Sequence, residues 1–536
     1  MATSSVVLSS CILFTVLGIL SLTLNFTFVL SSSSSQMVFP LTHSLSTTGF
    51  NNTHHLLKST SVRSTTRFNH HHRHRHNHHR HHSHRQRQIS LPLSPGSDYT
   101  LSLSLGSKPT QQISLYMDTG SDLVWFPCAP FDCIMCEGKY DPKVPYIKPL
   151  NYNNSADFIP CDSPLCSAVH SSLPSSDICA ISNCPLESIE MSECSSFACP
   201  SFYYAYADGS FVARLYRDNL SLEPISSSST TTQQQKSLHL KNFTFGCANT
   251  ALAEPIGVAG FGGGSLSLPA QLATFSPELG NRFSYCLISH SFKFDRIRKP
   301  SPLILGRYDD QKEKKISDHG GVVPSEFIYT PMLDNPKHPY YYCVGLEAIQ
   351  IGTTKIDTPM SLKRVNSKGN GGTVVDSGTT FTMLPSVVFE AVANEFGNRV
   401  GKMYKRAVET EDRTGLRPCF YYNNKNNKRG NWRVPKMVLH FTGKVSISLP
   451  QANYFFEFSG DDDEEGKKKK KKKKGEKVGC LMLGNAGEEE EGESSGPAAA
   501  LGNYQQQGFE VVYDLGQRKI GFAKKKCSSL WDNLNS

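Results

Sequence analysis

The stretch SLYMDTGSD, from Ser114 to Asp122, ends an apolar run on an aspartate that is followed by a hydroxyl residue and a glycine. The stretch GTVVDSGTT, from Gly372 to Thr380, repeats this arrangement much later in the chain. The apolar residues before each aspartate are typical of a buried β-strand, and the glycine allows a tight turn after it. Each stretch therefore predicts a carboxylate held at the tip of a rigid strand.

The surroundings of the two motifs repeat as well. Asp118 is followed by the glycine-punctuated apolar element GVAGFG at 257–262, and Asp376 is followed at a similar spacing by AALGNY at 499–504. Repetition of order and spacing indicates two versions of one structural unit. A two-fold relation between such units would bring Asp118 and Asp376 together at one seam.

The sequence after Tyr99 predicts a mostly β protein. It consists of short alternating runs separated by Gly, Pro and Asn, such as YTLSLSLG, RFSYCLI, KMVLHF and FEVVYDL. Helical patterns are confined to pieces such as LSLPAQLATF and SVVFEAVANEFGNRV. At 536 residues the chain is long enough for two lobes with separate cores. We expect two related β lobes with the active-site cleft between them.

Composition divides the chain into four regions. Residues 1–35 predict a signal peptide, with an uncleaved signal-anchor as the alternative. Residues 36–96 predict a low-complexity, His/Arg-rich pro-segment or spacer, which has too few apolar side chains to fold alone. Residues 97–300 and 301–536 are the expected N-terminal and C-terminal lobes. The second lobe carries a charged insertion at 459–497.

The formal net charge of +9 does not indicate a nucleic-acid partner. Much of the positive charge lies in two low-complexity tracts, His70–Arg87 and Lys467–Lys474. Metal binding by the His/Arg tract is a minor alternative to a solvated spacer. We expect the basic segment to shield an acidic cleft until its histidines charge, at about pH 6.5, and the carboxylates neutralise, at about pH 4.

The 16 cysteines, many of them grouped between Cys128 and Cys199, indicate disulfides formed in the secretory pathway. Cys343, within the strand-like YYCVGLEAIQI, is the expected buried free thiol. A zinc site is the less favoured alternative, because C-x-x-C occurs only once, at Cys133 to Cys136, without a second pair. No metal is expected. The sequons at Asn153, Asn219 and Asn242 predict glycosylation.

Two adjacent aspartates allow a specific chemistry. Carboxylates about 3 Å apart cannot both ionise, so they share one proton and titrate as a pair. The ionised member takes a proton from a bridging water while the protonated member donates one to a scissile carbonyl oxygen. A single Asp-Thr-Gly or Asp-Ser-Gly is usually only a turn, but two at repeated positions favour this catalytic interpretation. Motifs of serine hydrolases, zinc proteases and P-loops do not occur in the sequence.

The motifs resemble those of pepsin-family aspartic endopeptidases, and of the plant nepenthesin-type branch in particular. DTGSDLVW and VVDSGTTFTMLP are similar to the two active-site motifs, and YAYADGS, at Tyr204 to Ser210, is similar to the flap. GVAGFGGGSLSLPAQL, RFSYCL and LGNYQQQGFEVVYDLGQRKIGFAKKKC also resemble segments of that branch. The resemblance extends from Tyr99 to Trp531. It departs from the family at Ala207, where glycine is more usual.

The resemblance implies that Asp118 and Asp376 are the catalytic carboxylates. It implies supporting roles for the residues that follow them, which are Thr119, Gly120, Ser121, Ser377, Gly378 and Thr379. It further implies a flap in which Tyr206 closes over substrate, with Asp208 and Gly209 at the hairpin turn and Trp125 supporting it. By the same analogy the disulfide candidates are Cys286–Cys527, Cys419–Cys480 and Cys136–Cys247.

The expected function is that of an aspartic endopeptidase, active at acidic pH on protein or peptide substrates and made as a zymogen. It is expected to be a secreted monomeric glycoprotein of the cell wall or apoplast, with the vacuole as the alternative. No cofactor, nucleic acid or stable membrane association is expected unless the N-terminal segment is uncleaved. The alternative function is a non-catalytic pepsin-like binding protein, such as a cell-wall glycosidase inhibitor.

Overall fold

The computed structural model of the protein describes residues 36–43, 53–72, 99–106, 110–134, 150–151, 157–191, 194–206, 209–222, 237–252, 256–289, 299–306, 327–422, 432–460, 477–488 and 496–535. The expected signal peptide, the His/Arg tract beyond residue 72 and the poly-lysine run lie outside these residues, as do Cys136, Asn153, Ala207 and Asp208. Among the helices of the described segments, none is both long and apolar enough to cross a membrane.

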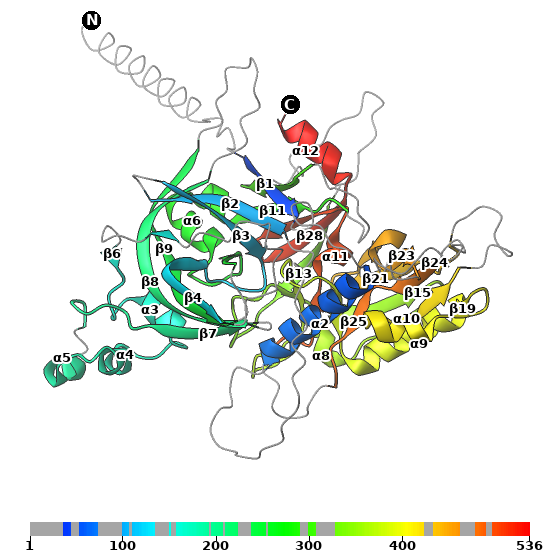
Figure 1. The fold of residues 1–536 in the computed structure, drawn as a ribbon, viewed down its shortest axis with the longest axis horizontal. Coiled ribbons are helices and arrows are strands. Elements are labelled where there is room, and N and C mark those ends of the chain that lie inside the picture. The colour runs from blue at the N-terminus through cyan, green and yellow to red at the C-terminus, as the bar shows by residue number, and fades with distance from the viewer. Residues whose placement is uncertain are drawn as a thin grey trace, which may run out of the picture. The chain divides into compact units, whose positions relative to one another are not determined.

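A continuous antiparallel ladder joins the two parts of the chain (Figure 1). Its strands, in spatial order, are β2 (Tyr99–Leu105), β1 (Met37–His43), β12 (Ser301–Leu305), β11 (Arg282–Cys286), β27 (Phe509–Asp514), β28 (Lys519–Lys524) and β13 (Ile328–Leu333). Strands from residues 37 to 524 thus share one hydrogen-bonded sheet. This ladder fixes the N-terminal and C-terminal parts of the fold to each other.

The first half adds strands around Asp118 and a group of short helices. The strands are β3 (Gln111–Asp118), β4 (Trp125–Ile134), β5 (Leu150–Asn151), β6 (Asp157–Phe158), β7 (Phe202–Tyr206), β8 (Gly209–Leu222), β9 (Leu238–Leu252) and β10 (Val258–Gly260). The helices are α3 (Pro164–Val169), α4 (Ser175–Ile181), α5 (Leu186–Met191), α6 (Leu268–Phe275) and α7 (Pro277–Gly280). Ser267 caps α6 by accepting a hydrogen bond from the Ala270 amide, so the helical pattern predicted there has a defined start.

The second half is built in the same way around Asp376. Its strands are β14 (Cys343–Val344), β15 (Leu346–Ile351), β16 (Thr354–Asp357), β17 (Thr373–Val375), β18 (Thr382–Leu384), β19 (Lys405–Arg406), β20 (Cys419–Tyr421), β21 (Met437–Phe441), β22 (Val445–Ser448), β23 (Phe455–Ser459), β24 (Lys477–Leu481), β25 (Leu483–Asn485) and β26 (Ala499–Leu501). The helices are α8 (Met360–Lys363), α9 (Ser386–Val400), α10 (Val408–Thr414), α11 (Asn503–Gln506) and α12 (Cys527–Asn535), with a 3-10 turn at Gln451–Asn453. The mostly β fold expected from the sequence is confirmed.

The internal repeat predicted from the sequence is present in the strand pairing. In the first half β3 runs parallel to β10, which places Gly260 opposite Asp118. In the second half β17 runs parallel to β26, which places Leu501 opposite Val375, the residue before Asp376. Each aspartate therefore ends a strand that is held by the later glycine-containing element of the same half.

Two elements arise from the His/Arg-rich segment before Tyr99. Strand β1 pairs with β12 and β2, and its residues Val38, Phe39 and Leu41 are buried. Helix α2 (Thr53–His72) lies in Figure 1 among the elements of the second half and contacts α10, β18 and β25, and also β7. Since α2 is rich in Ser, Thr and His, which are weak helix formers, its contacts with the rest of the protein are needed to stabilise it.

Candidate active site

Asp118 and Asp376 are held by matching sets of hydrogen bonds. Ser121 Oγ donates to Asp118 Oδ2 at 2.5 Å, and Thr379 Oγ1 donates to Asp376 Oδ2 at 2.5 Å. The amides of the two following glycines complete the pattern, since Gly120 donates to Asp118 Oδ1 at 2.9 Å and Gly378 donates to Asp376 Oδ1 at 2.8 Å. Each carboxylate is therefore fixed in one orientation by donors from its own turn.

The two turns are also bonded to each other by the hydroxyl residues of the two motifs. The Thr119 amide donates to Ser377 Oγ at 3.0 Å, and the Ser377 amide donates to Thr119 Oγ1 at 2.9 Å. The same hydroxyls donate to backbone carbonyls across the seam, from Thr119 to Val375 at 3.0 Å and from Ser377 to Met117 at 3.0 Å. Thr119 is 0% exposed and Ser377 is 1% exposed. This reciprocal set of buried hydrogen bonds sets the spacing of the two aspartates.

The two glycines let the carboxylates approach closely. A Cβ added to Gly120 would lie 2.8 Å from Cγ of Asp376, and one added to Gly378 would collide with the carboxylate of Asp118. Each glycine therefore packs against the aspartate of the opposite half. A side chain at either position would separate the pair, which explains why both motifs need glycine here.

The structure adds a residue that the sequence interpretation did not single out. Arg67 of α2 reaches both aspartates: its Nη2 lies 2.6 Å from Asp118 Oδ1, and its Nε lies 3.3 Å from Asp376 Oδ2. The Arg67 side chain is only 7% exposed. One guanidinium thus occupies the space between the two carboxylates. Arg suits this position because its guanidinium has several N–H donors and can bond to two carboxylates at once. The sequence interpretation had considered the His/Arg tract that follows Arg67 as the acid-sensitive segment.

The pKa values of the three groups reflect this contact. Burial pushes the pKa of Asp118 upward, but the charge and hydrogen bond of Arg67 and the donors around the carboxylate outweigh it and lower the pKa to about 2. Burial raises the pKa of Asp376, and the neighbouring charge of Asp118 adds to this increase. The pKa of Arg67 is raised because attraction to the two aspartates outweighs the effect of burial. The guanidinium is therefore charged throughout the accessible pH range.

The predicted flap is a β-hairpin beside this site. Strands β7 and β8 pair from Phe202 opposite Ala213 to Tyr206 opposite Gly209. The ring of Trp125 stacks on Phe211 of β8 with centroids 4.0 Å apart, and its flap-supporting role stays a prediction. The Tyr206 backbone lies at the end of β7, while its side chain and the turn residue Asp208 are outside what the structure describes. The role of Tyr206 stays a prediction.

A buried polar layer lies behind the second motif. Asn503 Nδ2 donates to the carbonyl of Ser377 at 2.9 Å, and Gln506 Nε2 donates to the carbonyl of Asp376 at 3.2 Å. The Tyr513 hydroxyl lies 3.2 Å from the Val375 carbonyl. These side chains come from the segment LGNYQQQGFEVVYDL. Its resemblance to the family was the feature of the sequence that could have indicated their role. They fix the backbone from which Asp376 projects.

The cysteine framework agrees with two of the three candidate pairs. Disulfides join Cys286 to Cys527 and Cys419 to Cys480. The expected pair Cys136–Cys247 is wrong, because Cys247 is bonded to Cys128. The physical reason is that β4 and β9 are parallel neighbours, with Phe126 opposite Cys247, so the next cysteine along β4 lies beside it.

The cysteine-rich insert is closed by two more disulfides, Cys161–Cys194 and Cys166–Cys199. These bonds involve the thiols that would otherwise form metal-ligand groups with Cys179 and with His170. In each group, two of the three possible ligands are therefore bonded to each other. Free buried thiols in the described residues are Cys179, Cys184 and Cys343, and the last agrees with the sequence expectation.

Two of the three candidate glycosylation sites lie in described segments. Asn242 is exposed in β9 and has φ of +55°. Asn219 is half-buried at a register shift in β8. Glycosylation at these residues stays a prediction.

The strand pairing and the facing Asp-(Thr/Ser)-Gly turns define the class of protein, a mostly β protein with a pepsin-like fold. Two family models match the chain, "Xylanase inhibitor N-terminal" at residues 99–307 and "Xylanase inhibitor C-terminal" at 341–524. The chain is 53% identical over 523 residues to a "Probable aspartyl protease" from Arabidopsis thaliana, covering 95% of this chain and 96% of that relative. The chain therefore belongs to the plant pepsin-like aspartic protease family, as its motifs indicated.

More distant relatives agree with this assignment. The chain is 28% identical to "Aspartic proteinase nepenthesin-1" from Nepenthes gracilis, over 81% of this chain and 78% of the relative. Among solved structures, the one titled "Crystal structure of edgp" aligns with a TM-score of 0.55 at 18% identity, covering 81% of this chain and 93% of that one. Conglutin gamma, a basic 7S globulin from lupine seeds, gives 0.52 at 16%, covering 81% and 95%. These structural likenesses show the fold alone.

Proposed function

We propose that the protein is an aspartic endopeptidase that is made in a latent form, with α2 blocking its catalytic aspartates. The observation that carries this proposal is the single guanidinium of Arg67 contacting both Asp118 and Asp376 between two otherwise complete Asp-(Thr/Ser)-Gly turns. The names of the protease relatives support the peptidase activity. Protein or peptide substrates follow from that activity.

In the active form, removal of Arg67 leaves two carboxylates whose other donors remain in place. The pair then shares a proton, and its ionised member takes a proton from a water held between the two aspartates. The protonated member donates to the oxygen of the scissile carbonyl while the water oxygen bonds to its carbon, which gives a diol. The diol then returns a proton to the ionised member, the other member protonates the amide nitrogen, and the C–N bond breaks to release the amine. Ser121, Thr379 and the two glycine amides orient the carboxylates during these steps.

The described disulfides support passage through the secretory pathway, where such bonds form. We therefore place the enzyme outside the cytosol, in the cell wall or apoplast, with the vacuole as the alternative. Latency suits this route, because an active endopeptidase would otherwise meet other proteins during secretion.

The test of catalysis uses the full-length protein treated with acid and assayed on a denatured protein substrate between about pH 2 and pH 6, the range in which carboxylates titrate. Asp118→Asn and Asp376→Asn are each expected to reduce cleavage by about 10⁴-fold or more, because neither variant can share the proton. Asp177→Asn, the same change at an exposed aspartate of α4, is the control and is expected to cleave normally. Unchanged cleavage in the aspartate variants would contradict the proposal.

A second candidate is a non-catalytic binding protein such as a cell-wall glycosidase inhibitor. The descriptions of the two matching family models, both xylanase inhibitor domains, favour it. It predicts inhibition of a xylanase that persists in the Asp118→Asn, Asp376→Asn double variant. Such inhibition, combined with no proteolysis by the acid-treated wild-type protein, would replace the first proposal with this one.

A further inference from the structure

Helix α2 contacts the second half over a strip that begins well before Arg67. Leu56 and Leu57 of α2 are each 0% exposed. They pack into an apolar cluster formed by Phe381, Ala407, Leu416, Cys419, Phe456, Phe458, Val478, Cys480, Met482 and Tyr504. The second half therefore accommodates two aliphatic side chains of α2 in a cluster that does not include the aspartates.

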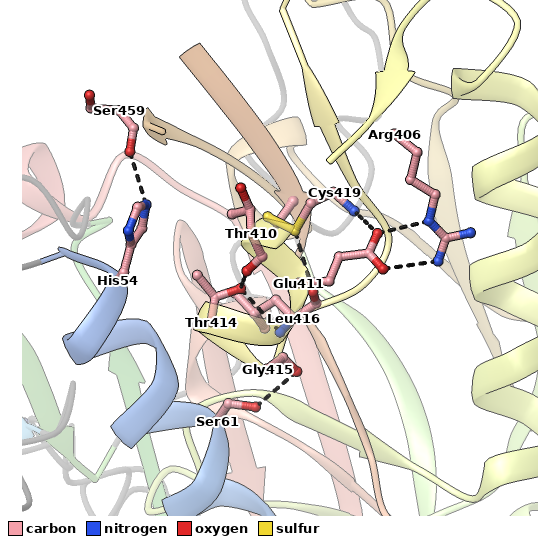
Figure 2. Close-up of a disulfide and its surroundings, with 11 residues drawn as sticks. His54, Ser61, Arg406, Thr410, Glu411, Thr414, Gly415, Leu416, Cys419 and Ser459 are labelled. Carbon is pink, nitrogen blue, oxygen red and sulfur yellow. Dashed lines mark hydrogen bonds and ion pairs between the residues drawn. A yellow bond between two sulfur atoms is a disulfide. The ribbon is translucent and has the colours of Figure 1, made fainter. Parts of the chain in front are cut away.

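Polar side chains of α2 on both sides of Leu56 and Leu57 extend the contact. They bond to backbone groups of the second half (Figure 2). The pairs are His54 Nε2 with Ser459 O at 3.0 Å, Lys58 Nζ with Asp412 O at 3.0 Å, Ser61 Oγ with Gly415 O at 3.4 Å and Ser64 Oγ with the Phe381 amide at 3.3 Å. When α2 leaves, these backbone groups are open to water or to an extended peptide, which offers both donors and acceptors.

The walls of this strip are held by bonds that do not involve α2. Glu411 of α10 accepts two hydrogen bonds from Arg406, at 2.8 and 3.1 Å, and a third from the Cys419 amide at 2.9 Å (Figure 2). Cys419 is in turn joined to Cys480 of β24. Helix α10 ends at Thr414 and is capped by Gly415, whose φ of +71° turns the chain toward β20. The strip is therefore expected to keep its shape after α2 has left.

The distance along α2 relates this strip to the position of peptide cleavage. From Leu57 to Arg67 the helix advances by about 15 Å, at about 1.5 Å per residue. An extended peptide covers the same distance with four or five residues, at about 3.3 Å each. A substrate side chain at that separation from the scissile bond would lie where Leu56 and Leu57 lie now.

We propose that the active enzyme binds an aliphatic substrate side chain, four or five residues from the scissile bond, in the place occupied by Leu56 and Leu57. We call this place the leucine site and define it by Ala407, Leu416, Phe456, Phe458 and Tyr504. The proposal rests on the proposed endopeptidase function and names part of its substrate preference. It makes α2 an inhibitor that occupies both the aspartates and a remote recognition site.

The test compares peptides that share one cleaved bond. Acid-activated wild-type protein is first given a short peptide that has three residues on each side of that bond. It is then given longer peptides that carry either Leu or Ser at one position, four, five or six residues from the bond. We expect Leu to exceed Ser in kcat/KM by about 10- to 100-fold at four or five residues on one side of the bond, the effect of burying one such side chain. Equal values for Leu and Ser at every position would overturn the leucine site.

Variants of the protein locate the effect. Ala407→Leu fills the leucine site, so the ratio of Leu to Ser kcat/KM measured within this variant is expected to fall toward one. Val408→Leu is the matched control, because Val408 follows Ala407 in the chain but is 56% exposed. This variant should keep the wild-type ratio of Leu to Ser kcat/KM. If Ala407→Leu does not fold, the wild-type comparison of peptides decides alone.

The two proposals fail in different ways. A short peptide that is cleaved, together with no preference for Leu in the longer ones, contradicts only the leucine site. Failure to cleave any peptide, short or long, contradicts the endopeptidase function and the leucine site with it.

Discussion

At the scale of single residues, the site depends on small groups placed symmetrically around two carboxylates. The hydroxyls of Thr119 and Ser377 bond the two turns together, and those of Ser121 and Thr379 orient the carboxylates. None of these four residues is chemically reactive by itself. Their effect is to keep the two acidic groups adjacent, which is the condition for sharing one proton.

The Thr379 hydroxyl provides a test of this role. It donates to Asp376 at 2.5 Å and lowers the pKa of that carboxyl, whose net pKa is nevertheless raised by burial. Thr379→Val removes the donor, so the ionised form of the pair is less stable and the alkaline limb of the pH–activity profile should move upward by about 1 pH unit. Thr353→Val, at an exposed threonine, is the control and should leave the profile in place. A shift to lower pH would contradict the assignment.

At the scale of elements, the structure assigns a role to α2 that its sequence only partly indicates. The aspartate motifs, most strands, and helices α6 and α9 were predictable, because apolar periodicity and turn residues are local signals. Helix α2 was not, because its few buried apolar residues, Leu56, Leu57 and Phe68, acquire a pattern only against the second half of the protein. The pairing of Cys247 with Cys128 was missed for a related reason, since strand neighbours are long-range information.

Arg67 is the residue through which α2 is expected to block catalysis. Arg67→Gln removes the charge between the aspartates but keeps the helix contacts made by Leu56 and Leu57. We expect this variant to cleave peptides at pH 5 without prior acid treatment, at least about 10-fold faster than the wild-type protein, because a buried charge pair is lost.

The control for Arg67→Gln makes the same change of charge one helical turn away. Arg63 lies over the Tyr116 ring at 5.6 Å, and Arg63→Gln should leave the protein latent at pH 5. Equal activation by both variants would show that the net charge of α2, and not the contact with the aspartates, maintains latency. Activity is read from the cleavage rate of one short peptide, with the intact chain verified by mass spectrometry.

At the scale of the whole molecule, one ladder of strands and one helix connect the N-terminal segment to both halves. Strand β1 is buried between β2 and β12, whereas α2 is attached through side chains that line a functional site. The two elements therefore differ in what their removal exposes. Loss of β1 would uncover Leu101, Leu303 and Leu305 of the core, while loss of α2 would uncover the aspartates and the leucine site.

The pH dependence of latency follows from the groups that face Arg67, which are Asp118, Asp376 and, on the same helix, Arg63. The pKa of Asp118 is lowered from 3.8 to about 2 while α2 is bound. Because this pKa is lowered, the ionised Asp118 stabilises the state with α2 bound at any pH above 3.8. This stabilisation is lost as the pH falls from 3.8 toward about 2. The pKa of Asp376 is raised by burial and by the charge of Asp118, but the charge of Arg67 acts to lower it, so the contact with Arg67 favours the ionised form of this aspartate as well.

Because Asp118 makes the shorter contact with Arg67, we expect its protonation to control release of α2. Protection of residues 53–72 from hydrogen exchange should persist at pH 5 and disappear between 3.8 and about 2. The Asp118→Asn variant should lose this dependence, because its side chain does not titrate in that range. A transition at about pH 6.5 would instead indicate control by histidine. That outcome would assign activation to the His/Arg tract and leave Arg67 as a passive contact.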